Sequence, residues 1–228
     1  MAERRATGTP LAYLTGCQSF MGIELLADEG ALVPREETEL LGNTALTMLR
    51  EIGGTPRVID MCCGSGNLAC AIAHQLPAAR VWASDLTDGC VQLTRRNVQH
   101  LSLSDRVTVG QGDLFAGLAD LGLEGSIDAV VCNPPYISTG KLASTSALLL
   151  DHEPREAFDG GPYGLSIHQR VIREALPFLR PGGMLLFEIG LAQDRQLAML
   201  FKRELSYDGL QFVANLSGEL RVAHARKR

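Results

Sequence analysis

The stretch Arg57-Val-Ile-Asp-Met-Cys-Cys-Gly-Ser-Gly66 decides the fold of this chain of 228 residues. It opens with a short apolar run that ends at Asp60, which predicts a buried strand. A turn with Gly64 and Gly66 follows, and the apolar spacing over 68–76 then predicts a helix. Glycines let the backbone approach a ligand closely, and a helix amino terminus offers unpaired N–H groups to a carboxylate or a phosphate. Ordinary tight turns also contain such glycine pairs, so this stretch alone predicts a strand, a turn and a helix.

The same alternation of apolar strands and helices continues along the chain. We expect further strands at 80–85, 107–109, 127–132 and 184–188, with helices at 89–101 and 165–179. Near the C-terminus, a helix at 193–205 and two antiparallel strands at 210–214 and 219–225 complete the sheet. Continuous apolar strands separated by helices indicate a parallel sheet covered on both faces. The sequence therefore predicts an α/β fold with a mostly parallel, seven-stranded sheet.

The beginning of the chain has a different pattern. Gln18-Ser-Phe20 and Ile23-Glu-Leu-Leu26 flank Met21-Gly22 and predict a small β-hairpin. A helix is expected from Pro34 to Arg50, because the acidic residues of its first turn suit the positive end of the helix dipole. We therefore divide the chain into an N-terminal segment with a β-hairpin, residues 1–35, and a domain over residues 36–228.

The composition argues against several classes of protein. The net charge of −5 provides no overall basic field, so a nucleic-acid substrate is disfavoured. The six cysteines include no Cys-x-x-Cys pair, so we expect reduced thiols and no metal site. The chain starts with no signal peptide and contains no run of about 18 apolar residues. These features predict a cytoplasmic protein without a membrane span.

Acidic residues end three successive strands around the glycine turn and indicate a cofactor site. Asp85 lies 25 positions after Asp60, where a carboxylate can bond ribose hydroxyls, and Asp113 follows the third strand, where it can accept from an adenine amino group. A dinucleotide enzyme would carry a third glycine at the position of Ala69. The acid at Asp60 suits a positively charged sulfonium better than a pyrophosphate. The pattern therefore predicts S-adenosylmethionine as the cofactor.

The acceptor site is expected at Asn133-Pro-Pro-Tyr136, which closes the fourth strand. The two prolines fix the backbone and remove two N–H donors, so the loop presents oxygen acceptors. An –NH2 group can donate to the Asn133 amide oxygen and to the Pro134 carbonyl, which aims its lone pair at the methyl group. Tyr136 can stack on a planar acceptor and shield it from water. We therefore predict Asn133, Pro134 and Tyr136 as the catalytic residues of a methyl transfer to nitrogen.

Asn133-Pro-Pro-Tyr136 resembles the signature of methyltransferases that act on amides, adenines or cytosines, and further motifs narrow the resemblance. Over nearly the whole chain, the sequence resembles the catalytic domain of bacterial release-factor glutamine methyltransferases. The further motifs are Arg5-Ala-Thr-Gly8-Thr-Pro10-Leu-Ala-Tyr13-Leu-Thr-Gly16, Phe20-Met-Gly22, Pro34-Arg35-Glu-Glu-Thr38-Glu39, Glu153-Pro154-Arg155-Glu-Ala157, Gly160-Gly161-Pro-Tyr-Gly164-Leu165 and Glu188-Ile-Gly190. The resemblance implies a class I, Rossmann-like S-adenosylmethionine-dependent methyltransferase. Its implied acceptor is the side-chain amide nitrogen of the glutamine in a release factor's Gly-Gly-Gln loop.

The resemblance also implies two sets of binding residues. The cofactor set is Asp60, Cys62, Gly64, Gly66, Asp85, Leu86, Gly112, Asp113, Leu114 and Asn133. The substrate set is Phe20, Arg35, Thr38, Pro135, Tyr136 and Glu153. Within the second set, Glu153 is expected either to order the loop near Arg155 or to touch the substrate.

Several departures from the family pattern keep other functions open. Position 62 is Cys where the family has Gly, and because a cysteine adopts positive φ only at a cost, we expect the turn to avoid it there. Tyr163 replaces an acid, and the family's N-terminal docking domain has no counterpart, so a partner chain is one conceivable source of that surface. The alternatives are a small-molecule methyltransferase or related S-adenosylmethionine-using enzyme, and, ranked lowest of the three, a non-catalytic binding subunit. His152 and His168 are interpreted as loop residues without a catalytic role.

Overall fold

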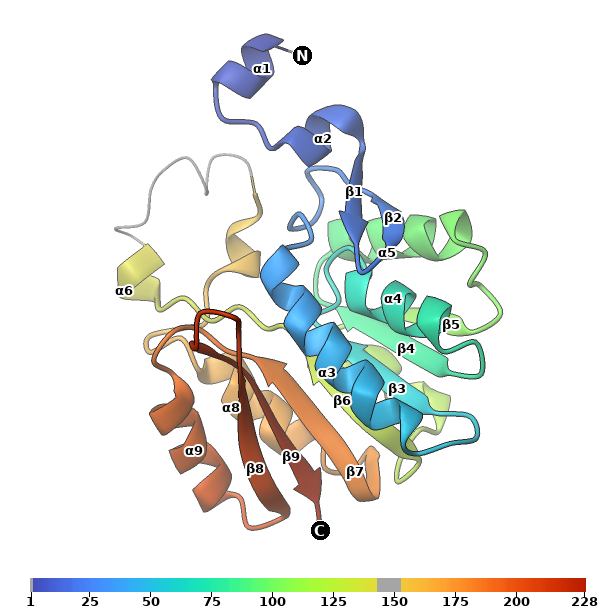
Figure 1. Cartoon of the computed structure of the whole chain (residues 1–228), viewed down its shortest axis with the longest axis vertical. Coiled ribbons are helices and arrows are strands. Elements are labelled where there is room, and N and C mark those ends of the chain that lie inside the picture. The colour runs from blue at the N-terminus through green and yellow to red at the C-terminus, as the bar shows by residue number, and fades with distance from the viewer. Residues whose placement is uncertain (1, 143–152) are drawn as a thin grey trace.

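The computed structural model describes residues 2–142 and 153–228, and seven strands of these residues form one sheet (Figure 1). The strands are β3 (Arg57–Met61), β4 (Arg80–Asp85), β5 (Val107–Gln111), β6 (Ile127–Cys132), β7 (Leu179–Glu188), β8 (Tyr207–Ala214) and β9 (Leu220–Lys227). Their order is β5-β4-β3-β6-β7-β9-β8, and β9 runs antiparallel to both of its neighbours while the other pairs are parallel. The predicted sheet and its closing antiparallel pair are confirmed.

Helices cover both faces of the sheet, as the continuous apolar strands predict. The helices α3 (Glu39–Arg50), α4 (Asn67–Gln75) and α5 (Asp88–His100) pack on one face, and η2 (Leu114–Leu121), α8 (Ser166–Glu174) and α9 (Asp194–Arg203) pack on the other. Successive side chains of a strand point to opposite faces. Val58 therefore packs in the first core and its neighbour Ile59 in the second, and both are fully buried. This two-sided burial fixes the register of β3.

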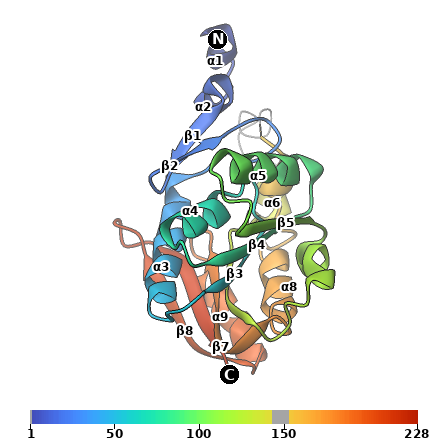
Figure 2. The same ribbon diagram turned by 90° about the vertical axis from the view of Figure 1, so that its right-hand side faces the viewer.

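The N-terminal segment extends from one end of the domain (Figure 2). It contains α1 (Ala2–Ala6), α2 (Leu11–Thr15) and the predicted hairpin of β1 (Cys17–Phe20) and β2 (Ile23–Leu26), which is confirmed. Asn97 of α5 anchors the hairpin, because its amide oxygen accepts from the Leu26 N–H at 2.7 Å and its Nδ2 donates to the Leu26 carbonyl at 3.2 Å. The same Nδ2 donates to the Ser65 carbonyl at 2.9 Å. The boundary at residue 35 stays a prediction.

Two predicted helix boundaries are wrong. The helix expected from Pro34 begins at Glu39, because Arg35 is extended and a 3-10 turn, η1 (Glu36–Thr38), comes first. The helix expected over 165–179 ends at Glu174. Leu179 already pairs with Ile127 of β6. The register then shifts, so that residues 180–183 come before the next pair, which Met184 forms with Ala129. Strand pairing thus overrides the helical spacing of these residues.

Short elements that the sequence pattern does not predict complete the chain. They are α1, α2, α6 (Thr139–Leu142) and the 3-10 elements η1, η2 and η3 (Arg155–Ala157). Most span three to five residues, too few for a periodic apolar pattern to develop. Over residues 2–142 and 153–228, none of the helices has the length and apolar character needed to cross a membrane.

The packing of α3 on the sheet predicts a large difference between two leucine-to-alanine substitutions. Leu46 of α3 is 1% exposed in the core, so Leu46→Ala should lower the free energy of unfolding by about 2–5 kcal/mol, through lost burial and a residual cavity. Leu216 is fully exposed, so Leu216→Ala should change it by less than about 0.5 kcal/mol. Urea unfolding measures both values. Equal effects would contradict the placement of α3.

Candidate functional site

A cavity of about 390 Å³ opens at the carboxyl ends of β3, β4 and β6. The strand order reverses there, since the chain runs from β3 outward to β5 and returns to β6 on the other side of β3. Such switch points are where open α/β sheets bind ligands. The structure brings eleven of the predicted site residues to this cavity. They are Arg35, Thr38, Asp60, Cys62, Gly64, Asp85, Leu86, Asp113, Leu114, Asn133 and Pro135.

The glycine turn has a left-handed backbone at three positions. Cys62, Gly64 and Gly66 have φ angles of 59°, 56° and 77°. The expectation that Cys62 avoids positive φ is therefore wrong. Backbone bonding around the turn explains this, because the Cys63 N–H donates to the Ser84 carbonyl at 3.1 Å and holds the chain in place. Gly66 does not line the cavity; a Cβ there would lie 2.6 Å from the Thr94 methyl group, so close packing with α5 requires glycine.

Asp60 is a buried carboxylate with one unpaired oxygen. Its Oδ2 accepts from the Ala69 N–H at 2.9 Å, while its Oδ1 has no hydrogen-bond partner among the residues that the structure describes. Burial, with a smaller contribution from the negative charge of Asp85, raises the pKa of Asp60 to about 7. An ionised carboxylate in this position favours a cationic ligand group.

The side of the cavity near β4 and β5 has the features of a nucleoside site. Asp85 accepts from the Gly64 N–H at 2.9 Å, and Leu86 exposes 58% of its surface beside it. Leu114 has a φ of 52° and is buried against the second core. Asp113 lines the cavity and forms an ion pair with Arg170 at 2.9 Å, and its contact with an adenine amino group stays a prediction. Gly112 does not line the cavity but packs directly on the backbone of Gly117.

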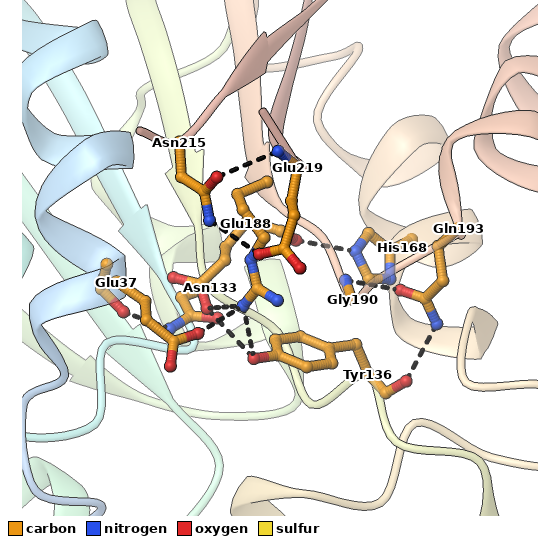
Figure 3. A network of polar contacts seen from close by, with 11 residues as sticks. Glu37, Asn133, Tyr136, His168, Glu188, Gly190, Gln193, Asn215 and Glu219 are labelled. Carbon is orange, nitrogen blue, oxygen red and sulfur yellow. Dashed lines mark hydrogen bonds and ion pairs between the residues drawn. The ribbon is translucent and has the colours of Figure 1, made fainter. Parts of the chain in front are cut away.

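The acceptor loop after β6 holds its polar groups in fixed orientations. Nδ2 of Asn133 donates to the Thr38 hydroxyl at 3.0 Å, which leaves the Asn133 amide oxygen available as an acceptor. Pro135 lines the cavity, whereas Pro134 and Tyr136 do not. The Tyr136 hydroxyl donates to Glu188 at 3.2 Å (Figure 3). The Arg221 guanidinium lies 5.8 Å from the centroid of the Tyr136 ring. The Tyr136 ring is thus packed on a cation and not free in the cavity.

Besides Tyr136, two of the predicted substrate residues do not line the cavity. Phe20 is 1% exposed and packs in the core beneath α3, because the turn after β1 folds back onto that helix. Glu153 is buried behind the rim, where it pairs with Arg35 at 2.5 Å and accepts from the Val33 N–H at 3.1 Å. Its partner is therefore Arg35 and not Arg155. The pair joins two parts of the chain that are far apart in sequence and holds them together at the rim of the cavity.

His168 does not fit the description of a loop residue. His168 is fully buried in α8, and its Nε2 bonds the Glu188 carbonyl at 3.0 Å. Burial lowers its pKa to about 4, so it is neutral near pH 7. The expectation of a loop position is wrong for His168, and His152 lies outside the described residues. Trp82 is half-buried against the second core, with the Arg57 guanidinium 4.7 Å from its ring centroid.

Gln193 and Arg221 support the acceptor loop but were not predicted. Gln193 Nε2 donates to the Tyr136 carbonyl at 2.9 Å and to the Gly164 carbonyl at 3.2 Å, and its Oε1 accepts from the Gly190 N–H at 2.8 Å (Figure 3). Arg221 donates to the Tyr136 hydroxyl at 3.2 Å. These residues lie 57 and 85 positions from Tyr136, and no local pattern marks either of them.

No disulfide joins any of the six cysteines in the structure. Cys62, Cys63 and Cys90 line the cavity, and burial raises the pKa of the Cys90 thiol to about 12. Within residues 2–142 and 153–228, no group of three or more His, Cys, Asp or Glu side chains is arranged to hold a metal ion.

Comparisons with known proteins agree on one family. Residues 39–155 match the family model described as methyltransferase small domain. The release factor glutamine methyltransferase of Moorella thermoacetica is 38% identical over 99% of this chain and 78% of its own length. The enzyme of the same name from Geobacter sulfurreducens is 36% identical over 89% of this chain and 68% of its own length.

Solved structures share the fold. The release factor-specific protein-(glutamine-N5) methyltransferase of Alicyclobacillus acidocaldarius is 25% identical with a TM-score of 0.53, covering 86% of this chain and 94% of that one. A methyltransferase from Pyrococcus furiosus has a TM-score of 0.64 over 100% of this chain and 98% of its own, with 16% identity, which supports the fold alone. The Rossmann-like methyltransferase fold predicted for the chain is confirmed.

The raised pKa of Asp60 predicts a pH-dependent stability. The folded protein holds this proton up to about pH 7, whereas the unfolded chain releases it near pH 3.8. The contribution of Asp60 to the free energy of unfolding is therefore most favourable below pH 4, and it is lost as the pH rises to 7. The free energy of unfolding of Asp60→Asn should equal that of the parent near pH 4. At pH 8 it should exceed the parental value by on the order of 1–3 kcal/mol.

Urea unfolding at several pH values measures this difference. Asp120→Asn, which changes an exposed aspartate, serves as the matched control and should show no such trend. A difference for Asp60→Asn that stays constant with pH would show that the carboxyl group titrates normally.

Proposed function

This chain belongs to the release factor glutamine methyltransferase family, and from that premise we propose that it methylates the glutamine side chain of a release factor's Gly-Gly-Gln loop. It is an S-adenosylmethionine-dependent methyltransferase, as the family is. One observation carries the proposal for the acceptor: Asn133 borders the cofactor cavity with its amide held by Thr38, so that an oxygen acceptor is available to an incoming –NH2 group.

The charged residues that line the cavity support S-adenosylmethionine as its ligand. Bound there, the cofactor supplies a methyl group on a positively charged sulfur. Among the described lining residues, five are acidic and Arg35 alone is basic, so the cavity favours a cationic ligand with one carboxylate. The unpaired Oδ1 of Asp60 fits the cationic amino acid end. Asp85 and the exposed side chain of Leu86 fit the ribose and the adenine ring.

The acceptor loop would overcome the poor nucleophilicity of an amide nitrogen. Its lone pair is delocalised into the carbonyl group, so reaction requires that the nitrogen be held in one orientation. We assign the Asn133 amide oxygen as the acceptor for one amide proton of the glutamine, and the carbonyl of Pro134, the next residue of the loop but not one of the lining residues, as the acceptor for the other. Pro135 and Thr38 would border the same group, since both line the cavity. Tyr136 would act from behind the loop, because its hydroxyl is bonded to Glu188.

A protein acceptor accounts for the structure better than a small molecule does. The departure at Cys62 leaves the turn left-handed, so it gives no ground for a different cofactor or acceptor. Tyr163 is 87% exposed, outside the cavity, where it has no role in enclosing a small acceptor.

A translation-factor substrate and six unpaired cysteines also support a cytoplasmic location, which we include in the proposal.

Mass spectrometry of a release factor incubated with this chain and S-adenosylmethionine tests the proposal. The expected result is a gain of one methyl group on the glutamine of the Gly-Gly-Gln loop. A release factor with that glutamine replaced by alanine serves as the control and should gain none. Cofactor binding without any methylation of the release factor would refute the assignment of the substrate.

Asn133→Ala tests the division of roles within the site. The variant loses the oxygen that orients the acceptor, so kcat should fall at least ~100-fold while the Kd for S-adenosylmethionine changes less than about 3-fold. Stopped-time methylation assays and calorimetric titration measure the two quantities. Asn43→Ala, at an exposed position of α3, is the control and should retain parental values. A comparable loss of cofactor affinity would show that Asn133 mainly binds the cofactor.

A further inference from the structure

Gln193 joins three segments of the chain beside the acceptor loop of residues 133–136. Its Nε2 donates to the Tyr136 carbonyl at 2.9 Å and to the Gly164 carbonyl at 3.2 Å. Its Oε1 accepts from the Gly190 N–H at 2.8 Å, and Figure 3 shows the amide between Tyr136 and Gly190. One half-buried side chain thus connects the loop after β6, the loop before α8 and the turn after β7.

The partners of Gln193 allow only one orientation of its amide. All three partners are backbone groups with fixed roles, because a carbonyl accepts and an N–H donates. The two protons of Nε2 therefore serve Tyr136 and Gly164, and the amide oxygen serves Gly190. A glutamate of the same size would keep the bond to Gly190 but would place a carboxylate against two carbonyl oxygens. The arrangement therefore requires an amide at position 193.

The backbone of Gln193 is itself held, so its side chain acts from a fixed position. Its N–H donates to the Gly190 carbonyl at 3.3 Å. Its carbonyl accepts from the Leu197 N–H at 2.9 Å, at the beginning of α9. Leu197 is fully buried in the second core. The amide that reaches the acceptor loop is therefore tied to the hydrophobic core through α9.

The acceptor loop depends on external bonds because of its two prolines. Pro134 and Pro135 have no backbone N–H, so neither can donate a hydrogen bond to a neighbouring segment. Before them, Cys132 is held in the sheet by its pairing with β3 and β7. After them, the Tyr136 carbonyl is held by Gln193. Since proline also fixes φ, few torsions remain free between these two points, and the polar groups between them are held as well.

Glycines allow the acceptor loop to pack directly on the segment before α8. A Cβ atom at Gly160 would lie 2.7 Å from the Pro135 carbonyl oxygen, and one at Gly164 would lie 2.3 Å from the Tyr136 carbonyl oxygen. The Tyr136 and Gly164 carbonyls share Nε2 of Gln193 as their donor. Without this donor, two carbonyl oxygens without a shared partner would oppose the close packing. Gln193 therefore fastens the loop to the segment on which it lies.

We propose that Gln193 is a positioning residue for the methyl transfer, which holds the acceptor loop so that its oxygen acceptors keep the incoming amide nitrogen in line with the methyl group. This inference rests on the proposed function. Gln193 does not line the cavity, so it acts through the Tyr136 backbone and not by contact with the substrate. Without its bonds the loop is free to shift, and a misplacement of about 1 Å can lower a rate about 100-fold.

Two variants of Gln193 test this role. Gln193→Ala loses all three bonds, whereas Gln193→Glu loses the two donated by Nε2 and keeps the acceptor for Gly190. With a release factor as substrate, each should lower kcat about 10–100-fold and change the Kd for S-adenosylmethionine less than about 3-fold. If Gln193→Ala does not fold, Gln193→Glu decides alone. A parental kcat in Gln193→Glu, or a loss of cofactor affinity as large as the loss of kcat, would overturn the proposal.

Gln196→Glu is the matched control. It makes the same chemical change three residues further along the chain, at an exposed position of α9. Both kcat and the Kd for S-adenosylmethionine should stay within about 3-fold of the parental values. A loss of kcat in this variant equal to that in Gln193→Glu would assign the effect to the added charge and overturn the positioning role.

A measurement without substrate separates this inference from the proposed function. The Ile137 N–H, next to the held carbonyl, donates to the Phe158 carbonyl at 2.9 Å. Its hydrogen exchange, followed by NMR, should be at least ~10-fold faster in both Gln193 variants than in the parent and in Gln196→Glu. Exchange of the Val130 N–H, within β6, should be the same in all four proteins.

The exchange rates have two outcomes that would overturn the positioning role. One is equal exchange of the Ile137 N–H in all four proteins. The other is an equal acceleration at Val130, which would show that the variants loosen the whole domain and not the acceptor loop. A parent that fails to methylate a release factor but shows the expected exchange pattern would refute only the proposed substrate.

Discussion

The parallel pairing of β3 with both of its neighbours is the constraint on which the site depends. The end of β3 is in register with Ser84 of β4 and Cys132 of β6. The residues that follow, Cys62, Asp85 and Asn133, therefore reach the same edge of the sheet. Because paired strands lie about 4.8 Å apart, the glycine turn, the acid and the acceptor amide lie side by side. From β3 the chain continues to β4 and β5 on one side and then returns to β6 on the other side of β3. The loops after β3 and β6 therefore lead in opposite directions, and the cavity forms between them.

Two buried acids at this edge serve opposite purposes. Asp60 has an oxygen without a partner in the described structure, so its burial opposes folding until a cationic ligand arrives. Glu188 also has one unpaired oxygen, but its other oxygen accepts from the Tyr136 hydroxyl and faces the Arg221 guanidinium at 3.6 Å, so the protein itself compensates its charge. The first acid therefore favours a cationic ligand, and the second contacts Tyr136 and Arg221 within the protein. Proteins commonly accept lower stability at such positions in return for function.

The fold and the cofactor side of the site are predictable because their signals are local. Each of these signals, namely the apolar run of a strand, the glycine turn or the acid that follows a strand, occupies only a few neighbouring residues. The support of the acceptor loop is not predictable in this way, since Arg221 and Gln193 reach Tyr136 across 85 and 57 positions. Local preference also misleads where tertiary bonds prevail. Cys62 adopts a backbone conformation that cysteine disfavours, and Leu179 joins a strand although its spacing is helical.

Asn97 gives the N-terminal hairpin a mechanical connection to the cavity. A single rigid amide, fully buried in α5, holds the Leu26 backbone on one side and the Ser65 carbonyl of the glycine turn on the other. Tilting the hairpin away from the domain must therefore either break these bonds or pull on the turn. Because such coupling is reciprocal, a ligand that binds the turn more tightly with the hairpin in its present position also stabilises the hairpin there by the same factor.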